Sequence, residues 1–216
     1  MNITKMSDLS SNSPKWTMLY GSPGSGKTSL AISGKLRKLL VDLERGASRA
    51  IPNSYTDVWT PQSLEELTKE LNSDNVSSYD VIVIDTLGRL VEILVKKHSN
   101  ASGIANQNTW GSVRRDLLGW WLSLLKLDKH IVLTAHGKLD GETYRPEVLG
   151  NSPALILRDL DYVGVVKEHR IMFNMPNSWC KNTHSKMADE VIVGNSDNGF
   201  LEMLLEDVEA VNSIVA

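Results

Sequence analysis

A glycine-rich stretch near the N-terminus constrains the fold of this chain more than any other feature. It follows the pattern G-x-x-x-x-G-K-[ST], and its members are Gly21, Ser22, Pro23, Gly24, Ser25, Gly26, Lys27 and Thr28. The apolar residues 16–20 precede it and residues 29–32 follow it, so the pattern predicts a strand, a tight loop and a helix. Glycines reach backbone angles that other residues avoid, which lets consecutive N–H groups point at one anion.

This loop is predicted to hold the phosphates of a nucleoside triphosphate. A helix that begins at Lys27 would direct its unpaired N–H groups and its positive dipole end at the same point. The lysine is expected at the β- and γ-phosphates, and the Thr28 hydroxyl is expected on Mg²⁺. Ser29, the next residue, completes the set that we expect to contact the nucleotide.

Composition indicates a single α/β domain over residues 15–216, preceded by a flexible segment over residues 1–14. The net charge is −3, which excludes a basic field over the whole domain, so any contact with nucleic acid must come from local patches. Cys180 is the only cysteine, so no intrachain disulfide can form, as is typical of the reducing cytoplasm. No apolar run suits a signal peptide or a membrane span, and we therefore expect a cytoplasmic protein without a membrane partner.

Apolar runs and helical patterns alternate along the chain. Strands are expected at residues 15–20, 39–43, 55–60, 79–85 and 130–136, and helices at residues 27–37, 63–71, 87–97, 109–127, 152–159 and 199–211. Residues 98–108 and 137–150 are polar and rich in turn formers, which predicts loops, whereas residues 162–167 and 170–175 resemble paired strands. The pattern predicts a mostly parallel central sheet flanked by helices, with an antiparallel strand pair toward the C-terminus.

A carboxylate ends the most apolar of these strands. Asp85 follows residues 81–84, and the carboxyl end of a buried parallel strand is where open α/β sheets bind ligands. Beside a phosphate loop, this side chain can hold Mg²⁺ together with Thr28. The alternative is an ordinary turn residue at the end of a strand.

Two further polar residues end neighbouring strands. Glu44 follows residues 39–43 and can orient a water molecule toward the γ-phosphate, although it could equally be a solvated acid beside Arg45. His136 follows residues 131–135 and can donate to the γ-phosphate, unless it only bonds to the backbone. Together with Lys27, these two residues form the predicted catalytic set.

Four segments in this order resemble the RecA-type ATPase core: GSPGSGKT at 21–28, VDLERG at 41–46, VIVIDTLGRL at 81–90 and IVLTAH at 131–136. Within that group the chain is most similar to the small phage-encoded ATPases of single-strand annealing and recombination. The resemblance implies a RecA-like P-loop NTPase that takes ATP and Mg²⁺. It also implies that Glu44 activates water, that Asp85 is associated with the metal, and that His136 replaces the usual glutamine sensor.

The resemblance further implies partners. The polar stretches 98–108 and 137–150 occupy the positions that bind single-stranded DNA in RecA proteins, and here they offer mainly Lys138, Tyr144 and Arg145. RecA-type ATPases often receive a basic finger from the neighbouring subunit, for which Lys181 and Lys186 are the candidates. We therefore expect a homo-oligomer, ring or filament, that acts on single-stranded DNA. A single-stranded-DNA-binding protein would be a further partner. If a phage encodes the chain, the protein would be located in the host cytoplasm.

The leading hypothesis is thus a Mg²⁺-dependent ATPase of phage DNA recombination. A P-loop kinase of a small acceptor is the second hypothesis, although the arginines are scattered and form no run typical of a kinase lid. A third is a non-catalytic nucleotide switch that acts through a protein partner. DNA-stimulated phosphate release, acceptor phosphorylation, or binding without turnover would distinguish the three.

Overall fold

The computed structural model describes residues 13–71, 73–100, 103–150, 153–183, 190–192 and 199–206. Over these residues a ten-stranded sheet forms the centre, in the order β10-β8-β7-β1-β5-β4-β2-β3, with β6 paired to β5 and β9 paired to β7. The strands are β1 (Trp16–Gly21), β2 (Lys38–Asp42), β3 (Thr56–Trp59), β4 (Val81–Asp85), β5 (His130–Asp140), β6 (Thr143–Glu147), β7 (Tyr162–Lys167), β8 (Arg170–Met172), β9 (Lys181–Asn182) and β10 (Glu190–Ile192).

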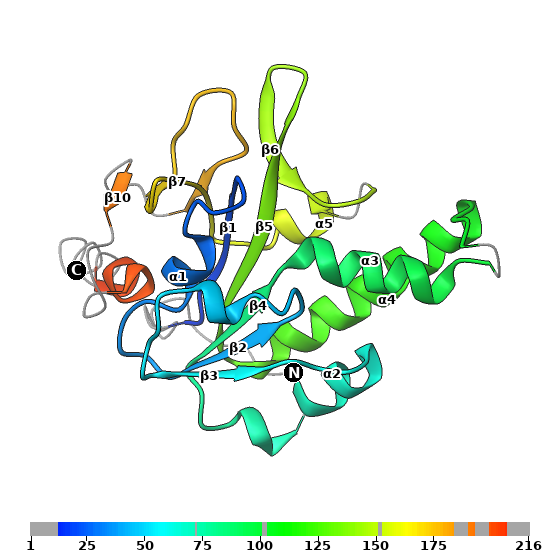
Figure 1. Ribbon diagram of the computed structural model, residues 1–216, viewed down its shortest axis with the longest axis horizontal. Coiled ribbons are helices and arrows are strands. Elements are labelled where there is room, and N and C mark those ends of the chain that lie inside the picture. Colours follow the sequence, from blue (N-terminus) through cyan, green and yellow to red (C-terminus); the bar gives the residue numbers. More distant parts are fainter. Residues whose placement is uncertain are drawn as a thin grey trace, which may run out of the picture.

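Six neighbouring strands of the sheet, β7-β1-β5-β4-β2-β3, run parallel (Figure 1). Their register aligns Gly21 with His136 and Asp42 with Asp85, so the strands that carry candidate site residues end at one edge. The pair β7–β8 is antiparallel, as is β8–β10. The predicted architecture is confirmed: a mostly parallel central sheet flanked by helices, with antiparallel strands toward the C-terminus.

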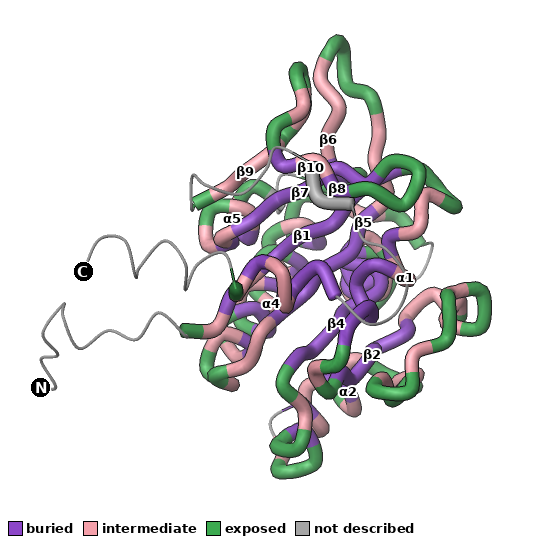
Figure 2. Tube along the Cα trace, turned by 90° about the vertical axis from the view of Figure 1, so that its left-hand side faces the viewer, coloured by how far each residue is buried: buried purple, intermediate pink, exposed green. Residues whose placement is uncertain are grey.

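Helices cover both faces of this sheet. They are α1 (Lys27–Ala31), α2 (Leu64–Leu71), α3 (Leu87–His98), α4 (Gln107–Leu124) and α5 (Pro153–Leu157), with short 3-10 turns η2 (Ala47–Arg49), η3 (Asp74–Val76) and η4 (Leu125–Leu127). One core packs α2, α3 and α4 against the sheet, and a second packs α1 and the helical residues 200–206 against the other face. Figure 2 shows β1, β4 and β5 buried between these layers. No helix in the described ranges combines the length and apolarity that crossing a bilayer requires.

The helix expected over residues 27–37 is wrong in its length, because α1 ends at Ala31. Gly34 has φ 88°, a left-handed conformation that ends helical geometry. The Glu202 carboxylate then accepts hydrogen bonds from the backbone N–H groups of Lys35 (2.6 Å) and Leu36 (2.9 Å). These contacts from the far end of the chain direct it into β2.

The loop expected over residues 137–150 is also partly wrong. β5 continues past His136 to Asp140 and pairs with β6 in an antiparallel hairpin, which we call the β5–β6 hairpin. Gly141, with φ 60°, makes the tight turn between the two strands. The hairpin projects from the sheet at the top of Figure 1. The second half of the helix expected over residues 199–211 lies outside the described residues.

Candidate nucleotide site

The glycine-rich loop joins β1 to α1 in the shape that its sequence predicts. Gly24 and Gly26 have φ values of 76° and 95°, which L-residues with a side chain rarely adopt. Gly21 lies so close to β7 that a Cβ there would collide with the Val166 carbonyl. The Ser25 N–H donates to the Ser22 carbonyl (3.2 Å) and closes the loop. Glycine is therefore needed at these positions for conformation and for close approach.

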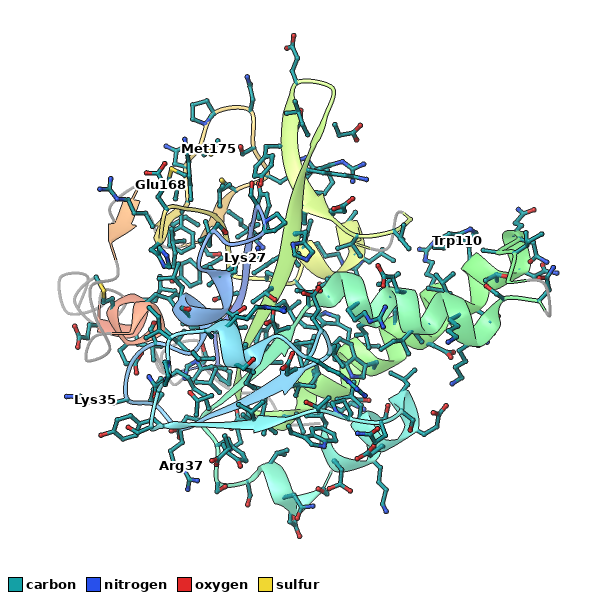
Figure 3. All side chains as sticks on the ribbon, in the orientation of Figure 1. Lys27, Lys35, Arg37, Trp110, Glu168 and Met175 are labelled. Atoms are coloured by element: carbon teal, nitrogen blue, oxygen red, sulfur yellow. The ribbon has the colours of Figure 1, made fainter. Side chains whose placement is uncertain are left out.

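Lys27 lies inside this loop, near the centre of the molecule (Figure 3). Only 6% of the residue is exposed, and its Nζ donates to the carbonyl oxygens of Gly21 (3.0 Å) and Ser22 (2.8 Å). Burial lowers the pKa of Lys27, whereas the nearby carboxylates of Asp85 and Glu44 act in the opposite direction. The pKa of Lys27 is lowered overall because burial outweighs the two carboxylates, which offset only part of the shift.

Asp85 is buried beside two hydroxyl groups. Thr28 Oγ1 donates to Asp85 Oδ2 (2.9 Å), and Thr134 Oγ1, from β5, donates to Asp85 Oδ1. Burial raises the pKa of Asp85, and the two hydrogen bonds oppose this shift. A hydroxyl and a carboxylate in contact offer the hard oxygen ligands that Mg²⁺ prefers, and Mg²⁺ otherwise uses phosphate and water. Thr28 and Asp85 supply two protein oxygens, which fits a cation that takes its other ligands from phosphate and water. Among the described residues, no three His, Cys, Asp or Glu form a group that could hold a metal.

Glu44 is anchored through one oxygen. Its Oε1 accepts from Thr86 Oγ1 (2.7 Å) and lies 3.2 Å from His136 Nε2. Its Oε2 makes no hydrogen bond or ion pair within the described residues, so this oxygen can accept from a water molecule. The strand pattern correctly predicts Glu44 and His136 at the same edge of the sheet, but it assigns no role to Thr86, the residue directly after Asp85.

The turn that carries Glu44 is fixed by an aspartate that the sequence pattern does not single out. Asp42 ends β2, and its two oxygens accept from the N–H groups of Gly46 (2.9 Å) and Ala47 (2.8 Å). Arg45 within this turn has φ 55°. Because the carboxylate satisfies two backbone donors at once, it holds residues 43–47 in one conformation.

A second element that the sequence pattern does not single out is the turn between β7 and β8, which packs on the phosphate loop. Glu168 (labelled in Figure 3) and His169 both have positive φ, 52° and 61°. The His169 N–H donates to the Ser25 carbonyl (3.1 Å), and its ring lies where a Cβ on Gly26 would be. This contact depends on the pairing of β7 with β1, which no local pattern in the sequence reveals.

The three residues predicted for DNA contact have different surroundings. The Tyr144 ring stacks on Tyr20, with centroids 5.5 Å apart, and its hydroxyl lies 3.4 Å from Ser22 Oγ. Arg145 pairs with Asp140 (2.6 Å). The side chain of Lys138, alone among the three, makes no hydrogen bond or ion pair within the described residues. Tyr144 thus packs toward the phosphate loop and is not a free stacking surface.

The two candidate finger lysines are not equally placed. Lys181 donates its Nζ hydrogens to the carbonyl oxygens of Arg158 (3.0 Å) and Leu160 in its own chain. It would have to leave both acceptors to reach a neighbouring subunit. Lys186 lies outside the described residues.

Changing Asp85 to asparagine should remove Mg²⁺-dependent nucleotide binding while leaving the protein folded. Asparagine keeps the size and one acceptor for Thr28 or Thr134, but it lacks the charge that a divalent cation needs. Titration with a fluorescent nucleotide, with and without Mg²⁺, measures the effect. We expect Mg²⁺ to increase the affinity of the wild type and not that of the variant. An equal response to Mg²⁺ in both proteins would exclude the metal role.

The sequence and the fold were compared with known proteins. A family model described as "AAA domain" matches residues 13–192. No curated protein matches the chain. Among solved structures, it is similar to the RadB recombinase, with a TM-score of 0.45 and 17% identity over 71% of this chain and 74% of that one. It is also similar to a KaiC-like protein from Pyrococcus horikoshii OT3, with a TM-score of 0.43 and 13% identity over 71% of each chain. Because the family model matches most of the sequence, from the segment before β1 to β10, this chain belongs to the family of AAA-domain proteins.

Proposed function

We propose that this chain binds ATP with Mg²⁺ and hydrolyses its terminal phosphate. One observation carries the proposal: five side chains from several elements converge where β1, β2, β4 and β5 end. Four of them form two contacts, Thr28 with Asp85 (2.9 Å) and Glu44 with His136 (3.2 Å). The fifth, Lys27, lies in the phosphate loop beside them. A structural salt-bridge network would not need a glycine loop that exposes backbone N–H groups to an anion.

Each residue has a defined task in this proposal. Lys27 neutralises charge on the β- and γ-phosphates as it develops. Glu44 orients a water molecule through Oε2 and accepts its proton while the water oxygen bonds to phosphorus and the bond to the β-phosphate oxygen breaks. His136 donates to the γ-phosphate or to Glu44, which connects the reacting group to the β5–β6 hairpin. Thr28 and Asp85 would hold Mg²⁺, which when bound neutralises phosphate charge.

Phosphate release from ATP tests the proposal directly. We expect turnover with Mg²⁺ and none with EDTA. Mixtures with small acceptors separate hydrolysis from kinase activity, because a kinase would transfer the phosphate to the acceptor. ATP binding without turnover under every condition would leave a nucleotide switch as the function and exclude the ATPase.

We further propose that the protein acts as a homo-oligomer on single-stranded DNA in phage recombination, in the host cytoplasm and together with a single-stranded-DNA-binding protein. The exposed tip of the β5–β6 hairpin, residues 139–142, and the Lys138 ammonium, unpaired among the described residues, support a DNA contact. The ion pair of Arg145 with Asp140 leaves less of its charge available. Lys138 is thus the stronger candidate of the two.

The double change of Lys138 and Arg145 to alanine should weaken binding of single-stranded DNA and abolish any DNA stimulation of hydrolysis. Basal hydrolysis should persist, because neither residue belongs to the phosphate site. The salt dependence should become shallower by about 0.7 in log–log slope for each DNA phosphate that the variant no longer neutralises. Fluorescence anisotropy with a labelled oligonucleotide at several salt concentrations measures this. Absence of wild-type DNA binding at low salt with ATP and Mg²⁺ would remove the direct DNA role.

A further inference from the structure

A cleft separate from the phosphate loop opens between α2, α3 and the segments that follow β2 and β3. Its volume is about 560 Å³, within the usual range of ligand pockets. Its lining is mixed: the apolar side chains of Leu43, Leu64, Leu90 and Ile93 lie beside polar and charged ones. We refer to it as the α2–α3 cleft. A binding partner would need aliphatic groups to cover this apolar surface.

The rim of the α2–α3 cleft carries an excess of positive charge. Two of its four basic residues are paired within the rim, Arg89 with Glu92 (2.8 Å) and Lys97 with Glu65 (3.0 Å). The side chains of the other two, Arg45 and Lys96, make no hydrogen bond or ion pair within the described residues. Arg45 and Lys96 are thus two cations without a partner among the described residues at the rim of one cleft, in a chain whose net charge is −3.

We propose that the α2–α3 cleft binds an acidic segment of a partner protein that also carries aliphatic side chains. Its carboxylates would pair with Arg45 and Lys96, and its aliphatic groups would cover Leu64 and Ile93. The observations favour protein over nucleic acid. Glu65 and Glu92 would repel carboxylates and phosphates alike, so charge does not separate the two classes. The apolar side chains Leu64 and Ile93 do, because aliphatic groups of a peptide can cover them and a phosphate backbone cannot.

Occupation of the cleft would also reach the nucleotide site. Leu43 and Arg45 line the cleft and flank Glu44 on either side in the chain. The turn is held by Asp42, which accepts from the N–H groups of Gly46 and Ala47. A segment that pairs with Arg45 contacts this turn directly, and any shift of the turn moves Glu44, so binding should alter the hydrolysis rate. This second step rests on the proposed ATPase function, whereas binding itself does not.

A peptide built from repeated Leu-Leu-Glu-Glu units and labelled with fluorescein is the probe for the cleft. Its anisotropy is measured with the full chain in the absence of nucleotide, so the result does not depend on catalysis. We expect saturable binding that weakens about tenfold or more when Arg45 and Lys96 are both changed to alanine. The matched control is the Lys69→Ala variant. Lys69 is an exposed cation on α2 outside the cleft, so this variant should bind the peptide as tightly as the wild type does. The Lys96→Ala change alone should also weaken binding while leaving basal hydrolysis intact.

Three results would overturn the proposal. They are no saturable binding of the acidic peptide, equal binding by the double variant and the wild type, and equal binding of a peptide in which lysine replaces glutamate. Displacement of the peptide by a short single-stranded oligonucleotide would likewise assign the cleft to nucleic acid. If the peptide binds as expected and no hydrolysis occurs in any sample, the ATPase proposal fails and the docking site stands. If hydrolysis occurs and peptide binding leaves its rate unchanged, the coupling through Arg45 is wrong.

Discussion

Replacing Lys27 by alanine should abolish detectable ATP hydrolysis while the protein remains folded. The ammonium is the only cation that the structure places inside the phosphate loop within the described residues, and it lies within hydrogen-bond distance of the Gly21 and Ser22 carbonyls. Loss of one preorganised group that stabilises transition-state charge lowers rates by about 10²–10³. Removing a full charge at the phosphates should lower the hydrolysis rate by at least that factor. Phosphate release measures it, with circular dichroism to confirm the fold.

The matched control is Lys35→Ala. Lys35 is an exposed lysine just beyond α1 whose side chain makes no hydrogen bond or ion pair within the described residues (Figure 3). The Lys35→Ala variant should hydrolyse ATP at the wild-type rate. Turnover of Lys27→Ala within a few-fold of the wild type would place the phosphate-binding function elsewhere in the chain. A loss shared equally by the Lys35 variant would indicate a general effect of removing charge near α1.

The sequence predicts the buried strands of this fold better than its exposed ones. Residues 81–85 and 131–135 are mostly apolar because both faces of a parallel sheet are covered, and such runs are easy to recognise. The β5–β6 hairpin has polar residues on its strands, a pattern that predicts a loop, although a glycine as the first residue of a two-residue turn, here Gly141-Glu142, is a recognised hairpin signal. Gly34 is a local signal for the end of α1, but the path of Lys35 and Leu36 into β2 could not be predicted locally, since it depends on Glu202 near the other end of the chain.

The same distinction applies to the site. Lys27, Asp85 and Glu44 could be placed because each follows or ends a strand whose direction the pattern reveals. Their hydrogen-bond partners could not, because these depend on the register between strands. Thr134 contacts Asp85 and Thr86 contacts Glu44 only once β4 lies between β2 and β5. The polar residue at the end of each strand is a signal that could have pointed to Thr86.

Changing Glu44 to glutamine should separate nucleotide binding from chemistry. Glutamine can still accept from Thr86 and His136 through its carbonyl oxygen, which reproduces the two contacts of Glu44 Oε1. An amide nitrogen then occupies the position of Oε2 and cannot take a proton from the attacking water. Hydrolysis should fall by roughly 10²–10⁴, the usual contribution of a general base. ATP affinity should stay within a few-fold, because the phosphate loop is untouched.

The contrast with Glu142→Gln makes this result specific to Glu44. Glu142 lies exposed at the turn of the β5–β6 hairpin, so the same chemical change there should leave turnover unaltered. Single-turnover phosphate release with saturating ATP measures the chemical step alone, and a fluorescent nucleotide reports affinity. If Glu44→Gln retains turnover close to that of the wild type, Glu44 is only an acid at a strand exit. If affinity falls in parallel with rate, Glu44 shapes the binding site and does not act as the base. Only a loss of rate at constant affinity fits a carboxylate held by Thr86 and His136 with its second oxygen directed at the water.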